Sequence, residues 1–228
     1  MKLSKILDKL EAQHGKPKLP QPSDGYEMLL HRNCGYPQSD ERCDKGFRAL
    51  KESVGLTPAR ILAVADARLA ETLRASGSGM MPEERARRLK ENAAIVESKF
   101  KSNLKGALKG TLAEDRKVLK QFATIGDSGA DKILLFSGTI PVAAVPANGV
   151  RVPLRIGFGE EKKNYATSYR AAQEYVEAEI PETFAARRRA YLLLKKHGEE
   201  ICRTKPLCEE CAVAKDCMYF QRTRNRNH

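Results

Sequence analysis

Residues 122–155 read FATIGDSGADKILLFSGTIPVAAVPANGVRVPLR, and this stretch decides the fold. Phe122 to Gly126 is apolar and ends in glycine, and Ala130 to Phe136 is an apolar run at helical length, so the pattern predicts a helix, a tight turn supplied by Gly126, and a second helix. The first backbone N–H groups of a helix that follows such a turn have no intrahelical acceptor, and a phosphate can accept from them. The stretch therefore predicts a hairpin that holds a nucleic-acid backbone without reading its sequence.

The same residues resemble, without gaps, the helix-hairpin-helix motif of the endonuclease III superfamily of DNA glycosylases. The resemblance continues in register through the family's following segment. The coinciding residues are Ile125, Gly126, Ala130, Asp131, Ile133, Leu134, Leu135, Phe136, Gly138, Pro141, Val145, Arg151, Val152, Arg155 and Gly157.

Both standard catalytic positions of that family differ in this chain. The resemblance places the lysine of the bifunctional members on Ser128 and the aspartate of nearly all members on Pro146. Serine at the first position also occurs in the adenine-excising, monofunctional branch. Proline provides no charge and no proton to an oxocarbenium-like transition state, so the standard chemistry is expected to be lost or strongly altered.

Three nearby residues are candidate substitutes. Lys132 lies one helical turn after Ser128 on the same face, where a relocated amine nucleophile is sterically conceivable. Asp127 lies at the tip of the predicted hairpin, and Asn148 could order a water molecule. The alternatives are a solvated or phosphate-facing lysine for Lys132 and a helix N-terminal carboxylate, favoured by the dipole, for Asp127.

The loop within residues 29–43 is a candidate DNA-inserting element. Residues 29–43 resemble the family's region in which a glutamine fills the gap left by an extruded base. Base extrusion requires a group that occupies the vacated place in the stack. Asn33 lies nearest the position of that glutamine, and Gln38 or Tyr36 is the alternative. The competing interpretation is an ordinary loop between helices that has no DNA-inserting role. The further candidate DNA contacts are Gly126, Gly129, Arg151, Arg203 and Lys205.

The composition favours a polyanionic partner. Among 228 residues, Lys and Arg number 41 against 29 Asp and Glu, which gives a net charge of +12, and the pI is about 9.5; double-stranded DNA is the expected partner. The sequence contains no continuous run of 18 apolar residues, the length that a membrane span needs, and its N-terminus lacks a signal-peptide pattern. We therefore expect a monomeric cytoplasmic, nucleoid-associated protein.

Four cysteines near the C-terminus form the pattern Cys202-x5-Cys208-x2-Cys211-x5-Cys217. Four thiols in so short a segment indicate a soft metal or an iron–sulfur cluster rather than disulfides, and spacing alone leaves zinc open. The surrounding residues, HGEEICRTKPLCEECAVAKDC, resemble the cluster loop of the endonuclease III family, with the first interval one residue short. The resemblance implies a [4Fe-4S] cluster, with zinc as the alternative. Cys34 and Cys43 are expected to be ordinary thiols.

The chain reads as helical nearly throughout. The resemblance implies an all-α, two-lobed fold: a six-helix barrel at residues 27–138, with its hairpin at about 114–136, and a cluster domain from residues 1–26 and 139–228 with its loop at 202–217. Three functions follow as hypotheses. The first is a DNA-binding protein of damage recognition or base excision repair with altered chemistry. The alternatives are an active monofunctional glycosylase with a non-standard catalytic residue and a DNA-associated redox protein.

Overall fold

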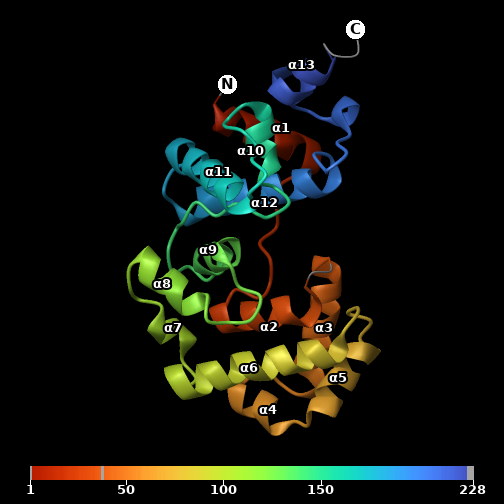
Figure 1. Cartoon of the computed structure of the whole chain (residues 1–228), viewed down its shortest axis with the longest axis vertical. Helices are drawn as coiled ribbons and strands as arrows, with labels where there is room; N and C mark the ends of the chain where they lie inside the picture. Colours follow the sequence, from red (N-terminus) through yellow and green to blue (C-terminus); the bar gives the residue numbers. More distant parts are fainter. Residues whose placement is uncertain (1, 37–38, 225–228) are drawn as a thin grey trace. The chain divides into compact units, whose positions relative to one another are not determined.

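The computed structural model describes residues 2–36 and 39–224, and all regular secondary structure in that part of the chain is helical (Figure 1). The prediction of an all-α fold is confirmed. The chain divides into two compact units: the hairpin unit, Pro20–Ile133, and the cysteine unit, which combines the chain up to Leu19 with the chain from Leu134 onward. The sequence prediction had placed the lobes at 27–138 and at 1–26 with 139–228. Each unit has its own apolar core.

The hairpin unit is built around its longest helix, α6 (Pro82–Phe100). Helices α2, α4 and α5 pack against α6, and α2 also packs against α3. Fully buried leucines of α2, α3, α5 and α6 form the centre of the core. The other helices are α2 (Gly25–Gly35), α3 (Asp40–Ser53), α4 (Pro58–Ala63), α5 (Asp66–Ala75), α7 (Leu104–Ala107) and α8 (Leu112–Leu119).

The cysteine unit brings the two ends of the chain together. Helix α1 (Leu3–His14) packs against α12 (Phe184–Glu200), and its apolar stripe, which contains Leu3, Ile6, Leu7 and Leu10, is buried there. The remaining elements are α10 (Arg151–Ile156), α11 (Tyr165–Glu179), the 3₁₀ turns η1 (Cys208–Glu210) and η2 (Ala214–Asp216), and α13 (Met218–Arg224).

Helix α9 (Asp127–Phe136) belongs to both units, because the boundary between them falls inside it. It begins earlier than the apolar run from Ala130 suggested, and α8 ends at Leu119. Apolar periodicity shows which residues are buried, whereas the helix ends depend on turn and cap geometry. Among the described residues, no helix combines the length and the apolarity that a membrane span requires.

Candidate nucleic-acid interface and metal centre

The α8–α9 hairpin is held together by a buried ion pair. Thr111 and Glu114 form a capping box at the start of α8, which satisfies two donors of its first turn. Further along, Arg116 donates from Nε and Nη2 to the two carboxylate oxygens of Asp131, at 2.7 and 2.8 Å. The Asp131 side chain is fully buried. This bidentate contact fixes the angle between the two helices of the hairpin.

Thr124, rather than Gly126, supplies the special backbone conformation of the turn. Thr124 has φ 66°, in the left-handed region, whereas Gly126 is not among the positive-φ residues. The expectation that Gly126 would supply the turn is therefore corrected. Side chains from two other helices hold the turn: Arg32 donates to the Thr124 carbonyl at 3.2 Å, and Asn92 accepts from the Ala123 N–H at 3.0 Å.

Gly126 instead keeps the start of α9 open. A side chain there would meet nothing within 4 Å, so the first turn of α9 faces solvent. The bond from the Ala130 N–H to the Gly126 carbonyl begins the helical ladder, and the amides before it have no intrahelical acceptor. Asp127 is exposed and pairs with Lys120 at 2.8 Å. Ser128 is half-buried in the same turn.

Lys132 lines a pocket within the hairpin unit. The pocket has a volume of about 270 Å³, just below the range of roughly 300–1,000 Å³ for small-molecule sites. Most of its polar lining comes from α2, α3 and α9, while Gln21 precedes α2, Tyr36 follows it, and Gly129 also lines the pocket. The polar and titratable lining residues are Gln21, His31, Arg32, Tyr36, Asp40, Cys43, Asp44 and Lys132.

Two carboxylates of this pocket were not identified from the sequence. Asp44 lies 2.8 Å from His31 Nε2, and Asp40 lines the same space. Burial lowers the pKa of His31, and the nearby Lys132 lowers it further, while the hydrogen bond to Asp44 raises it. Asp40 and Asp44 are one helical turn apart, so they lie on the same face of α3. This spacing was the feature of the sequence that could have pointed to a pair of carboxylates.

The proline at the family's aspartate position belongs to a packed turn of the cysteine unit. Pro146 is buried, and its carbonyl accepts from the Gly149 N–H at 2.8 Å. A Cβ on Gly198 of α12 would lie 2.3 Å from the Asn148 carbonyl oxygen. The Asn148 side chain donates to Glu199 of α12 at 2.7 Å. The turn is thus seated directly on α12.

The candidate DNA-inserting loop is described only in part. Asn33 is 2% exposed, and its amide donates to the Leu29 carbonyl at 2.9 Å and to that of Ala123 at 3.5 Å. It therefore links α2 to the hairpin turn. Gln38 lies outside the described residues. Tyr36 is 41% exposed, and the Arg32 guanidinium lies 3.8 Å from its ring centroid.

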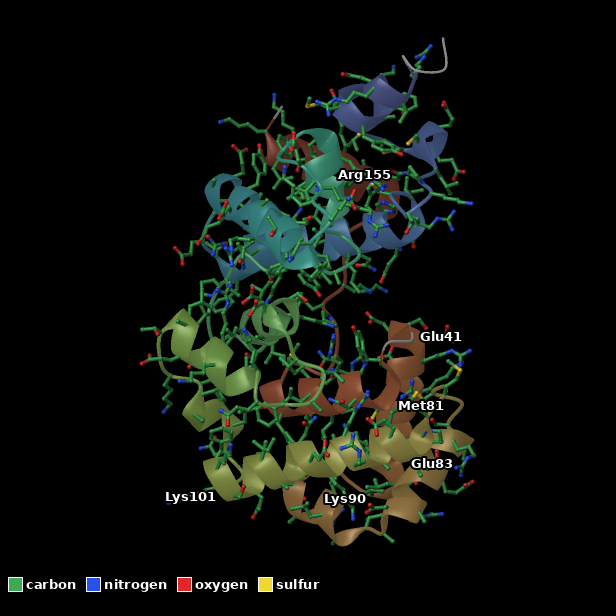
Figure 2. The ribbon with its side chains drawn as sticks, viewed as in Figure 1. Glu41, Met81, Glu83, Lys90, Lys101 and Arg155 are labelled. Atoms are coloured by element: carbon green, nitrogen blue, oxygen red, sulfur yellow. The ribbon has the colours of Figure 1, made fainter. Side chains whose placement is uncertain are left out.

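A second exposed apolar tip was not predicted. Met80 and Met81, between α5 and α6, are 69% and 63% exposed, and Met81 is labelled in Figure 2. Buried Arg85 supports their loop, since it donates to the carbonyls of Ser78 and Gly35 at 3.1 and 2.9 Å. Two methionines between a glycine and a proline were the signal in the sequence.

The four C-terminal cysteines surround one cavity. Cys202, Cys208, Cys211 and Cys217 line it together with mostly apolar side chains. Within residues 2–36 and 39–224, no three His, Cys, Asp or Glu side chains form a group that could hold a single metal ion. Burial raises the pKa of the Cys211 thiol to about 11 and also raises that of Cys202 and Cys208. Metal binding there must displace protons.

Two hydrogen-bonding side chains contact these sulfurs. Arg155 Nη1 lies 3.7 Å from Cys202 Sγ, and His197 Nε2 lies 3.5 Å from Cys211 Sγ. His197 Nδ1 is 3.0 Å from His14 Nε2, and burial lowers the pKa of His197 to about 4. The two histidines, in the last turns of α1 and α12, therefore contact each other.

The remaining basic candidates lie on or beside the cysteine loop. Arg203 and Lys205 are exposed, between Cys202 and Cys208. Arg151 of α10 donates to Thr204 Oγ1 at 3.0 Å. The three residues thus lie close together within the cysteine unit.

Comparison with known proteins agrees with this geometry. No protein-family model matches the chain. A curated protein of Methanocaldococcus jannaschii is 25% identical over 195 residues, covering 85% of each chain, and its name provisionally assigns it as a DNA repair glycosylase.

Solved structures match over nearly the whole chain. A thermostable thymine-DNA glycosylase superposes with a TM-score of 0.71 at 24% identity, covering 96% of this chain and 95% of its own. A non-covalent endonuclease III–DNA complex gives a TM-score of 0.75 at 18% identity, with 98% and 97% covered. The chain has the helix-hairpin-helix fold of the endonuclease III superfamily of DNA glycosylases, and the resemblance drawn from its sequence is confirmed.

Proposed function

We propose that this protein binds duplex DNA in damage recognition or base excision repair, with the standard glycosylase and lyase chemistry of its superfamily lost or strongly altered. The name of the Methanocaldococcus jannaschii relative and the DNA complex among the structural neighbours support the partner and the process. The basic composition, with a net charge of +12, supports the same partner. The α8–α9 hairpin is the observation that carries the proposal.

The hairpin suits a phosphate for two reasons. The first turn of α9 is open at Gly126, so its amides are accessible to an anionic oxygen. The turn itself is held by Arg32 and Asn92, so little order remains to be gained on binding. A rigid, open helix start binds backbone in any sequence context.

The two standard catalytic positions support the loss of standard chemistry. Ser128 has no amine for a Schiff base. At the other position, Pro146 is buried in a turn that packs on α12, and it has no ionisable group. Because residue 146 is itself a proline, no movement of its side chain can supply a carboxylate at this position.

The same proposal includes a [4Fe-4S] cluster bound by Cys202, Cys208, Cys211 and Cys217. All four cysteines line one small cavity with a mostly apolar lining, so they surround a common site. The resemblance of the surrounding residues to the family's cluster loop supports iron and sulfide over zinc at this site.

The contribution of the cysteine loop to DNA binding is tested by removing its two exposed charges. Arg203→Ala with Lys205→Ala is expected to weaken binding to every duplex alike and to reduce the slope of log K against log salt by about two, since each phosphate contact contributes roughly 0.9. Fluorescence anisotropy over a salt series measures both quantities.

The matched control for this experiment removes two exposed charges elsewhere. Arg68→Ala with Arg74→Ala removes two exposed charges of α5, which belongs to the hairpin unit, whereas the cysteine loop belongs to the cysteine unit. This variant should keep the wild-type slope. Equal slopes for both double variants would contradict a role for the loop, and salt-insensitive binding by the wild type would contradict the DNA proposal itself.

A second candidate function, an active monofunctional glycosylase, is favoured by the pocket of the hairpin unit. Asp40 and Asp44 place two carboxylates beside the His31 imidazole and the Lys132 amine. Hydrolysis of an N-glycosidic bond requires a carboxylate near the sugar and an acid for the departing base. Both kinds of group are present there.

Base release separates the two functions. On duplexes that carry deaminated, oxidised, alkylated or mismatched bases, the first proposal expects tight binding with no alkali-revealed abasic site. If a base is released, Asp44→Asn is expected to slow release by about 100-fold or more, the usual worth of a general acid or base, with binding unchanged. Glu52→Gln, which removes an exposed carboxylate near the other end of α3, is the control.

Borohydride trapping completes the assignment. Release with trapping would indicate an amine nucleophile and make Lys132 the residue to replace. Release that is equally fast in Asp44→Asn and in wild type would rule out the pocket carboxylate.

A further inference from the structure

Arg155 joins the beginning and the end of the cysteine motif. Its Nη1 donates to the Arg203 carbonyl at 2.7 Å and lies 3.7 Å from Cys202 Sγ. At the other end, its own carbonyl accepts from the Cys217 thiol at 3.3 Å. Figure 2 labels Arg155, which comes from α10 and thus from outside the cysteine loop.

The guanidinium is enclosed at the edge of the cavity that the four cysteines line. Its side chain is only 10% exposed, and Nε lies 3.5 Å from Glu161. The opposite side meets an aromatic face, because the carbon of the guanidinium lies 4.8 Å from the ring centroid of Tyr219. An arginine remains charged at any physiological pH, so this site carries a fixed positive charge with little water around it.

We propose that Arg155 is a positioning residue that sets the reduction potential of the cluster by stabilising its more negative, reduced state. This role rests on the cluster proposed above, and through it Arg155 influences whether that cluster is oxidised or reduced. Donors and charges next to the sulfurs are among the main determinants of cluster potential. In a site this poorly solvated, one unit charge has a larger effect than at the surface.

Arg155→Gln tests the charge. At a fixed electrode potential, the ratio of oxidised to reduced cluster is expected to rise at least about tenfold, which corresponds to a midpoint lower by about 59 mV for a one-electron couple. Arg155→Lys keeps the charge and should shift the ratio much less. Arg151→Gln is the matched control, because Arg151 is on the same helix and reaches Thr204 rather than a sulfur.

A second pair of variants tests the same idea in the opposite direction and leaves the arginine in place. Glu161→Gln removes the carboxylate that partly neutralises Arg155, so the ratio of oxidised to reduced cluster should fall. Glu160→Gln removes a neighbouring carboxylate that pairs with Lys162 instead, and a smaller change is expected. This pair decides the question if Arg155→Gln fails to take up a cluster.

Iron and sulfide content and visible absorption are measured for every protein before its potential. Wild type without iron would overturn the proposed cluster. Wild type with iron, but with equal potentials in Arg155→Gln and Arg151→Gln, or in Glu161→Gln and Glu160→Gln, would overturn the role of Arg155 alone.

Discussion

Asp131→Ala is expected to lower the free energy of unfolding of the hairpin unit by about 3 kcal/mol. Breaking one partner of a buried ion pair costs roughly 3–5 kcal/mol, because the other charge remains desolvated and unpaired. Here the Arg116 side chain is 25% exposed, so it regains part of its hydration and the lower end of the range applies. Urea denaturation followed by circular dichroism measures the loss as a lower midpoint at an unchanged slope.

An exposed ion pair in the same hairpin provides the control. Asp127 and Lys120 lie 2.8 Å apart with side chains 52% and 48% exposed, and such pairs contribute at most about 1 kcal/mol. Asp127→Asn should therefore unfold nearly as wild type does. Equal losses from Asp131→Ala and Asp127→Asn would contradict the structural role of the buried pair.

The hairpin variant also connects stability to binding. Arg116 and Asp131 determine how α8 meets α9, and the open amides of α9 have to face a phosphate at hydrogen-bond distance. At a temperature at which Asp131→Ala is still folded, we expect weaker binding to every duplex alike. Loss of binding to only some sequences would show that the hairpin reads bases.

Cys208→Ala is expected to abolish uptake of the cluster and to release the last part of the cysteine unit from its fold. The turns η1 and η2 and the short helix α13 contain no buried residue in their described parts. Polar contacts attach them to α1, among them Lys9 to Asp216 and Gln13 to the Glu210 carbonyl. Apolar contacts hold the same segment, since Val213 and Cys217 are buried in the core of the unit and Tyr219 and Phe220 pack against it. We expect the proposed cluster to add to these contacts, because metal binding contributes directly to the folding free energy of such loops.

Metal analysis and limited proteolysis measure the two effects of that substitution. Iron should fall from about four atoms per chain, the content of one cubane, to near zero. Cleavage after residue 201 should accelerate at least about tenfold, because proteolysis follows the population of the open state. Cys43→Ser, in a buried thiol of the hairpin unit, should keep the full iron content.

The outcome also distinguishes the metals. Wild-type protein that contains one zinc ion and no iron, prepared under anaerobic conditions with iron and sulfide supplied, would replace the cluster by a structural zinc site. Full iron content in Cys208→Ala would contradict the assignment of that ligand.

Local patterns in the sequence determined much of this protein. The apolar run from Ala130 to Phe136 predicted a helix, and α9 contains it, because helical burial repeats every three or four residues along one segment. The spacing of Cys202, Cys208, Cys211 and Cys217 likewise predicted a common site, and all four line one cavity. Such features depend on residues that are close to one another in the sequence.

Only the tertiary structure decided which residues are enclosed and what they contact. The polar amide side chain of Asn33 suits a DNA contact, yet the packing of α2 against the hairpin turn buries it. His31 meets Asp44 across 13 positions, and Arg155 meets Cys202 across 47. No local pattern encodes these partners, because they are brought together by the packing of whole helices, and side-chain burial and pairing follow from that packing.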